Sequence, residues 1–252
     1  MTDDDRRAWQ LVLEAIELEL FSDRLGPGDH LPPERTLAAS LGVGRSSVRE
    51  ALRVLEVLGL IRTQAGSGPQ AGAIVVARPS GGMSTLMRLQ VAAQVFPVAD
   101  VVKTRLALES SIVTELASTP GVNLAEASEL LDAMDSPGLS AEEFLALDAQ
   151  FHLTLAEASG NVVVTAMMAG LRNSIERYVI AGLAHLTSWP ATAARLRREH
   201  RDVLRAIAAH DAEDAAARVR AHIDGYYTES RLSRPLPLPL AGHSTSTSTE
   251  GR

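Results

Sequence analysis

Apolar residues recur at helical spacing along most of the chain. Residues 8–23 carry one apolar stripe, which predicts an amphipathic helix, and the same period runs from residue 84 to residue 230 with short interruptions. The interruptions contain proline, glycine, asparagine or aspartate, which end or begin helices. They separate seven predicted helices, at 84–95, 98–118, 123–135, 140–158, 161–185, 190–209 and 212–231. Helices joined by such short connections are typical of an antiparallel bundle.

The segment 31–61 predicts two short helices joined by a tight turn. Its apolar positions keep a helical period, and Gly42 offers the permissive backbone that the turn needs. Polar residues lie near the outer, N-terminal end of the second helix: Arg45, Ser46, Ser47 and Arg49. A recognition helix presents these positions to the DNA major groove, where an arginine fork can bond guanine or clamp a phosphate. The alternative is an ordinary helical hairpin whose arginines are solvated.

Two short strands are predicted at 61–63 and 73–76, on either side of the glycine-rich segment QAGSGPQAG. Such a hairpin would form the wing of a winged helix-turn-helix. The alternative is a flexible surface hairpin that has no role in DNA binding.

These patterns predict a mainly α protein with two domains. Residues 1–78 would form a winged helix-turn-helix DNA-binding domain with a small β-hairpin wing, and residues 79–83 a linker. Residues 84–231 would form an all-α bundle of about seven helices, to which the family resemblance described below assigns ligand binding and dimerisation. Residues 232–252 are Pro-rich and then Ser/Thr-rich, which predicts a disordered tail.

Composition narrows the class of protein. Hydrophobic residues make up 46% of the chain and aromatic residues only 4%, which favours helices over sheets. The absence of cysteine excludes disulfides and thiolate metal sites. No apolar run approaches the roughly 20 residues that span a bilayer, and the acidic N-terminus lacks a signal-peptide pattern. We therefore expect a soluble, cytoplasmic protein with no membrane partner.

The charge distribution favours nucleic acid as a partner, although the net charge is −7. Residues 35–62 contain five arginines and two acids, a local net charge of +3. A modular DNA binder needs positive charge only where it touches phosphate. An acidic remainder would discourage non-specific coating of DNA.

Four residues of the second predicted domain have the chemistry of metal ligands. Asp148 and His152 lie four residues apart in a helical pattern, so their side chains project from one face among apolar neighbours. His200 and His222 lie in the last two predicted helices, each with apolar residues one turn away. A carboxylate with three imidazoles suits Zn²⁺, Ni²⁺, Mn²⁺ or Fe²⁺. The alternative is a set of core histidines that bond backbone or carboxylate groups.

The segment PPERTLAASLGVGRSSVREALRVLEVLGLI resembles the winged helix-turn-helix of GntR-family transcription regulators. The chain departs from the usual family pattern at Gly44, where serine is common. Glycine is a usable N-cap, but it removes one hydroxyl that could contact phosphate. The resemblance implies DNA contacts by the following residues, the last two at the wing tip: Arg35, Arg45, Ser46, Ser47, Arg49, Gly66 and Ser67.

The segments LDAQFHLTLAEASGN, REHRDVLRAI and VRAHI resemble the FCD-type effector domain of the FadR subfamily of GntR regulators. The resemblance implies that Arg105 faces an effector pocket, whereas the residues alone equally allow a surface pair of Arg105 with Glu109. Asn161 either caps the next helix or faces that pocket. The resemblance also implies that four side chains bind a divalent metal ion: Asp148, His152, His200 and His222.

Three functions compete on this reading. The first is a transcription regulator, most simply a repressor, that binds a pseudo-palindromic double-stranded operator as a homodimer and responds to a small organic acid. The second is a metal-dependent enzyme with a facial-triad-like site, fused to a DNA-binding head. The third is an architectural DNA binder with a purely structural metal ion. We expect the first, and no catalytic residues.

Overall fold

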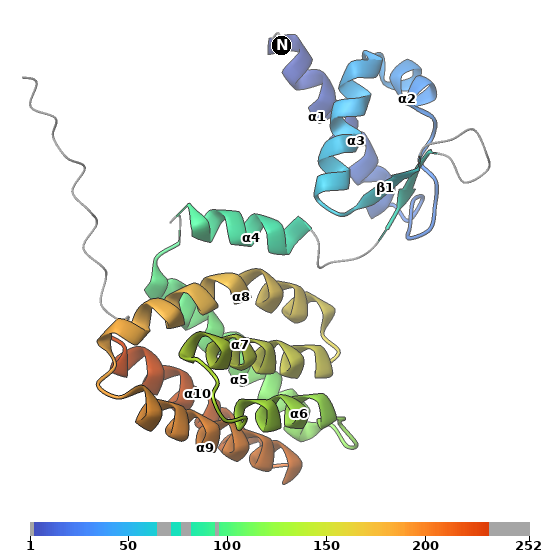
Figure 1. Cartoon of the computed structure of the whole chain (residues 1–252). Coiled ribbons are helices and arrows are strands. Elements are labelled where there is room, and N and C mark those ends of the chain that lie inside the picture. The colour runs from blue at the N-terminus through green and yellow to red at the C-terminus, as the bar shows by residue number, and fades with distance from the viewer. Residues whose placement is uncertain (1–2, 65–71, 77–81, 94–95, 232–252) are drawn as a thin grey trace, which may run out of the picture.

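The computed structural model describes residues 3–64, 72–76, 82–93 and 96–231 (Figure 1). This part of the chain contains ten α-helices, one short 3-10 helix and a two-stranded sheet. The elements in chain order are α1 (Asp3–Phe21), α2 (Glu34–Leu41), α3 (Arg45–Val57), β1 (Ile61–Gln64), β2 (Gly72–Val75), α4 (Gly82–Ala92), α5 (Val98–Ser118), α6 (Ala125–Met134), α7 (Ala141–Ala158), α8 (Val162–Gly182), η1 (Leu183–His185), α9 (Trp189–Ala208) and α10 (Ala212–Glu229). None of these helices is both long and apolar enough to cross a membrane.

The N-terminal elements fold around a small hydrophobic core of their own. α3 packs between α1 and α2, and its buried stripe includes Val48, Leu52 and Leu55. Gly42 ends α2 with a φ of 67°, a left-handed conformation that glycine adopts without strain, so the chain turns directly into α3. β1 and β2 pair antiparallel, with Ile61 opposite Val75. These elements form the helix-turn-helix and the base of the wing that the sequence predicts.

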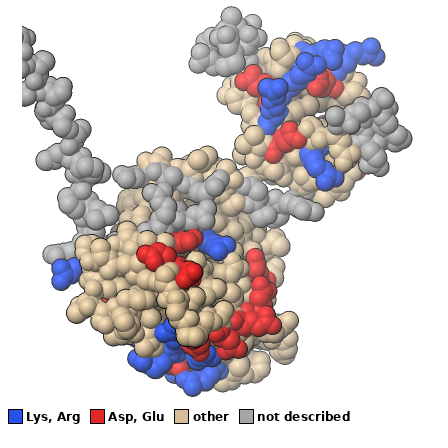
Figure 2. Space-filling view, in the orientation of Figure 1, with Lys and Arg blue, Asp and Glu red and all other residues tan. Residues whose placement is uncertain are grey.

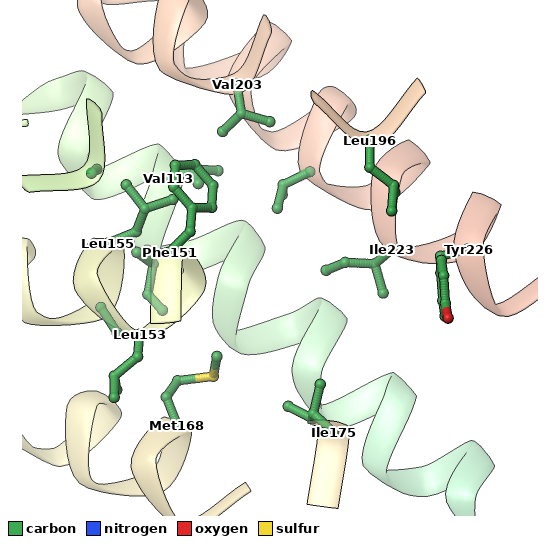
Figure 3. Close-up of a cluster of buried hydrophobic side chains, with 14 of the residues drawn as sticks. Val113, Phe151, Leu153, Leu155, Met168, Ile175, Leu196, Val203, Ile223 and Tyr226 are labelled. Atoms are coloured by element: carbon green, nitrogen blue, oxygen red, sulfur yellow. The ribbon is translucent and has the colours of Figure 1, made fainter. Parts of the chain in front are cut away.

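The remaining helices form a bundle with a second, larger core. Figure 3 shows apolar side chains from five helices, α5 and α7 to α10, converging on the interior. α5 packs along α10, α7 along α8, and α9 along α10. α4 lies along α8 (Figure 1). The two helices approach closely at Gly170, where an added Cβ would lie 2.9 Å from the Met87 Cβ.

The helical period predicted most of these elements to within one turn. The first helix begins at Asp3 rather than at residue 8. The predicted helix 161–185 ends as α8 at Gly182, and its last residues form the tighter helix η1. The wing tip (65–71) and the tail lie outside the described residues, and the domain boundaries remain predictions.

Candidate functional site

The start of α7 is fixed by a capping box. Ser140 Oγ accepts the backbone N–H of Glu143 at 3.1 Å, and Glu143 Oε2 accepts the N–H of Ser140 at 2.8 Å. Asp148 and His152 therefore project one turn apart from the same face of a well-anchored helix. That face points into the bundle, since the two residues are 4% and 3% exposed.

The last two long helices bring two histidines to the same point. Ser188 caps α9 and Asp211 caps α10, each by accepting the N–H three residues later. His200 of α9 is fully buried, and His222 of α10 is 3% exposed. With Asp148 and His152 they offer four ligand atoms that all lie within 4.8 Å of one another. The structure thus assembles all four predicted metal ligands from three helices.

The Nε2 atoms of the three histidines face one another. His222 Nε2 lies 3.2 Å from His152 Nε2 and 3.1 Å from His200 Nε2. Asp148 Oδ1 lies 3.0 Å from His200 Nε2. Ligand atoms about 2.1 Å from one ion are about 3.0–3.4 Å apart in octahedral or tetrahedral geometry. These three separations fit a first-row divalent ion, whereas Asp148 lies 3.9 Å (Oδ2) from His152 Nε2 and 4.0 Å (Oδ1) from His222 Nε2, wider than adjacent ligand positions.

Two carboxylates stand behind these rings. His222 Nδ1 lies 2.9 Å from Glu199 Oε2, and His152 Nδ1 lies 2.5 Å from Glu109 Oε2. A carboxylate can only accept, so Glu199 places the ring proton of His222 on Nδ1 and leaves its Nε2 with a lone pair, whereas Glu109 lies close to His152 Nδ1 without hydrogen-bond geometry. The lone pair of His222 Nε2 faces His152 Nε2 at 3.2 Å, where it can accept a proton from that ring or bind a cation. Carboxylates behind ligating histidines are common at metal sites, and sequence analysis did not find either role.

The ionisation of the site suits metal binding at neutral pH. Burial, followed by the charge of His222, lowers the pKa of His200 to about 4. Burial also lowers the pKa of His222. Burial opposes ionisation of Asp148, but its hydrogen bond with His200 and the nearby rings hold its pKa below the usual range. Neutral imidazoles and an ionised carboxylate are the forms that bind metal.

Arg105 of α5 reaches the same site. Its Nε lies 2.5 Å from Glu109 Oε1, and both side chains are 3% exposed, which excludes the exposed surface pair. Burial alone would raise the pKa of Glu109, but Arg105 and His152 outweigh it and lower that pKa to about 2. Arg105 Nη2 is buried and has no hydrogen-bond partner among the described residues. The buried Tyr227 hydroxyl interacts with the same guanidinium, so an anion at Nη2 would share this arginine with Tyr227.

A small cavity lies between Arg105, Asp148 and His222. Its volume is about 10 Å³, and its other walls include the apolar residues Leu196 and Ile223. This space holds about one water molecule. An organic acid therefore enters only if side chains of the wall move apart.

Asn161, the other predicted effector residue, is not part of this site. Its side chain is exposed, and its Oδ1 accepts the N–H of Val164 at 3.1 Å as the N-cap of α8. The effector-binding prediction for Asn161 is corrected to a capping role, because its oxygen already satisfies a first-turn donor.

A second candidate site lies at the start of α3. Arg45, Ser46 and Arg49 are exposed there, and Arg35 of α2 is exposed too. Ser47 is only 4% exposed, because it lies on the stripe of α3 that packs into the core. The prediction that Ser47 contacts DNA is therefore corrected to a packing role. Gly66 and Ser67 of the wing tip lie outside the described residues.

The same surface carries features that sequence analysis missed. Arg53 follows Arg49 by one helical turn and is also exposed. Glu34, the first residue of α2, places Oε2 2.9 Å from Arg49 Nε and 3.7 Å from Arg45 Nη2. Figure 2 shows basic side chains gathered in a band on the N-terminal part, with acidic side chains next to them. The acids and arginines of this surface therefore interact before any DNA is bound.

Comparisons with known proteins agree on one class of protein. A candidate L-lactate dehydrogenase operon regulatory protein of Escherichia coli K12 is 28% identical over 229 residues, covering 88% of this chain and 86% of that protein. The Glc operon transcriptional activator of the same strain is 27% identical over 214 residues, 82% of each chain. A solved GntR structure from Streptococcus agalactiae has the same fold, with a TM-score of 0.58, 24% identity and coverage of 90% of this chain and 100% of that one.

Two family matches cover most of the chain. Residues 10–69 match the family described as bacterial regulatory proteins, gntR family, and residues 100–225 match the FCD domain. These relatives regulate transcription and are not enzymes. The chain therefore belongs to the GntR family of DNA-binding transcription regulators, in the group that carries an FCD domain.

Proposed function

We propose that this regulator holds a divalent metal ion in its FCD domain and senses a small organic acid there. The proposed ligands are the four buried side chains Asp148, His152, His200 and His222. The observation that carries the proposal is the set of facing Nε2 atoms, of which that of His222 keeps its lone pair because Glu199 holds the ring proton on Nδ1. Imidazole and carboxylate ligands suit Zn²⁺, Ni²⁺, Mn²⁺ or Fe²⁺, and such an ion, when bound, supplies positive charge and open positions for an anion.

Arg105 supports a carboxylate as the effector. Its unpartnered Nη2 points to an anion that reaches both the guanidinium and the metal ligands. The narrow, partly apolar cavity favours an acid of few atoms. The name of one relative refers to an L-lactate dehydrogenase operon, which supports a small organic acid as the class of effector.

For the DNA-binding half, we propose that Arg35, Arg45, Ser46 and Arg49 contact the operator. A homodimer would read two inverted half-sites about one helical turn apart, as members of the FadR subfamily would. Gly66 and Ser67 remain proposed minor-groove contacts. Binding of the acid would relieve repression through a coupling free energy of about 1–3 kcal/mol, enough to change operator affinity by one or two decades.

The sensing function is tested by thermal shift on metal-loaded protein with a panel of two- to four-carbon acids. We expect one acid to raise the melting temperature by roughly 5–10 °C at 100 times its dissociation constant. The same acid should change operator affinity. If no acid moves either quantity, the metal ion is structural and the sensing proposal is wrong.

Glu199→Gln is expected to weaken metal binding by about 10- to 100-fold. The amide no longer fixes the proton on His222 Nδ1 or raises the basicity of Nε2. Competition with a chelator measures the affinity. Glu157→Gln, a change at an exposed glutamate of α7, is the control and should leave the affinity unchanged. Equal affinities for Glu199→Gln and wild type would show that this carboxylate does not support the ligand.

A further inference from the structure

The exposed arginines of α3 share one acidic neighbour. Glu34 Oε2 lies 2.9 Å from Arg49 Nε and 3.7 Å from Arg45 Nη2. The arginine side chains are 59% and 60% exposed, and that of Glu34 is 32% exposed. The carboxylate therefore belongs to the surface that the proposed function assigns to DNA, where a negative charge by itself opposes binding.

The contact between Glu34 and Arg49 occupies a specific part of the guanidinium. It uses Nε, while the two Nη atoms are not in the contact. Those two atoms form the end of the fork that bonds guanine O6 and N7 together. The Glu34 carboxylate thus restricts the rotation of the long Arg49 side chain and leaves its two Nη atoms available to a base.

The charge of Glu34 acts on phosphate contacts. A DNA phosphate that approaches Arg45 or Arg49 meets a carboxylate within 4 Å of both side chains. Repulsion between the two anions weakens phosphate contacts on any sequence, whereas a guanine edge carries no net charge and is repelled less. The same residue therefore penalises sequence-independent contacts more than base contacts.

From these contacts we infer that Glu34 is a specificity-determining residue, which orients Arg49 for guanine and keeps Arg45 and Arg49 from acting as plain phosphate binders. The inference rests on the proposed role of α3 in DNA binding. A simpler role for Glu34 is to stabilise the first turn of α2, where acids favour the helix dipole. The two roles differ in their effect on DNA sequence discrimination.

The test compares dissociation constants for two duplexes. One is the duplex that the wild-type protein selects from a random pool, and the other is a mixed-sequence duplex of equal length. Glu34→Ala is expected to lower the ratio of the two affinities by at least about fivefold, the lower end of what a bidentate arginine–guanine contact contributes. The salt dependence of mixed-sequence binding should steepen by about 0.9 in log–log slope for each phosphate gained.

Two variants separate the effects of charge and position. Glu34→Gln keeps an acceptor for Arg49 Nε but no charge, so its salt slope should match that of Glu34→Ala while its affinity ratio stays nearer to wild type. Glu50→Ala removes one negative charge from the same surface of α3, and Glu50 has no ion pair among the described residues. Its affinity ratio should stay at the wild-type value.

The inference is overturned if Glu34→Ala keeps the wild-type ratio, or if Glu50→Ala lowers it equally. Thermal melts check that the variants fold. The variant Arg49→Ala distinguishes a wrong role for Glu34 from a wrong assignment of α3 to DNA binding. If Arg49→Ala also binds the selected duplex normally, the DNA contacts of α3 are wrong; if it loses affinity, only the role of Glu34 is wrong.

Discussion

The double change His200→Ala and His222→Ala is expected to remove measurable metal binding and, with it, the response to the organic acid. It deletes two of four ligands and leaves only Asp148 and His152, both on α7. A four-ligand structural zinc site is worth about 10–16 kcal/mol, so losing half of the ligands lowers affinity by roughly a thousandfold or more. Metal content after dialysis against a stoichiometric amount of Zn²⁺ measures the loss.

The control removes two imidazoles from elsewhere. His30→Ala with His185→Ala changes exposed side chains and should keep the wild-type metal content. Operator binding without effector should remain in both double variants, because the ligands belong to the C-terminal core. Full metal occupancy in the His200/His222 variant would place the ion elsewhere and contradict the proposed site.

Arg45→Ala and Arg49→Ala should each weaken operator binding by about 1–3 kcal/mol without loss of fold. Both side chains are exposed at the start of α3, so their removal leaves no cavity in the core. Their effects should not add, because the two guanidinium groups share Glu34. Titration of the selected duplex at fixed salt measures the change.

Arg24→Ala is the matched control for these arginines. Arg24 is an exposed arginine of the N-terminal part, and it pairs with Glu19 rather than with α3 or Glu34. Its removal should change operator affinity by much less than either α3 variant. Wild-type affinity in both Arg45→Ala and Arg49→Ala would remove α3 from the DNA interface.

The sequence predicts the helices well, because each long helix buries a stripe whose period is visible in the residues themselves. The burial of Ser47 could also have been predicted from the helical period. Ser47 lies four residues before Ala51 and eight before Leu55, on the buried stripe of α3. Its neighbour Ser46 lies on the exposed side. Helical phase, applied more strictly, separates these two serines without a structure.

Contacts between distant helices are harder to predict. The four-residue spacing predicted that Asp148 and His152 share a face, but only the packing of α9 and α10 brings His200 and His222 to them. Glu109 and Glu199 were not predicted for the same reason, since their roles depend on rings from other helices. The one local signal was weak: Glu199 directly precedes His200.

The tight contact at Gly170 connects the helices that carry the proposed metal ligands to α4. α7 carries two of the proposed ligands, rests on α8, and α8 in turn rests on α4, the first helix after the DNA-binding part. Packed interiors compress very little. Because Met87 and Ser84 of α4 already lie against Gly170, a displacement of α8 toward them would displace α4 as well. A rearrangement of the proposed ligands on α7 would therefore reach α4 through two helix contacts, that of α7 with α8 and that of α8 with α4.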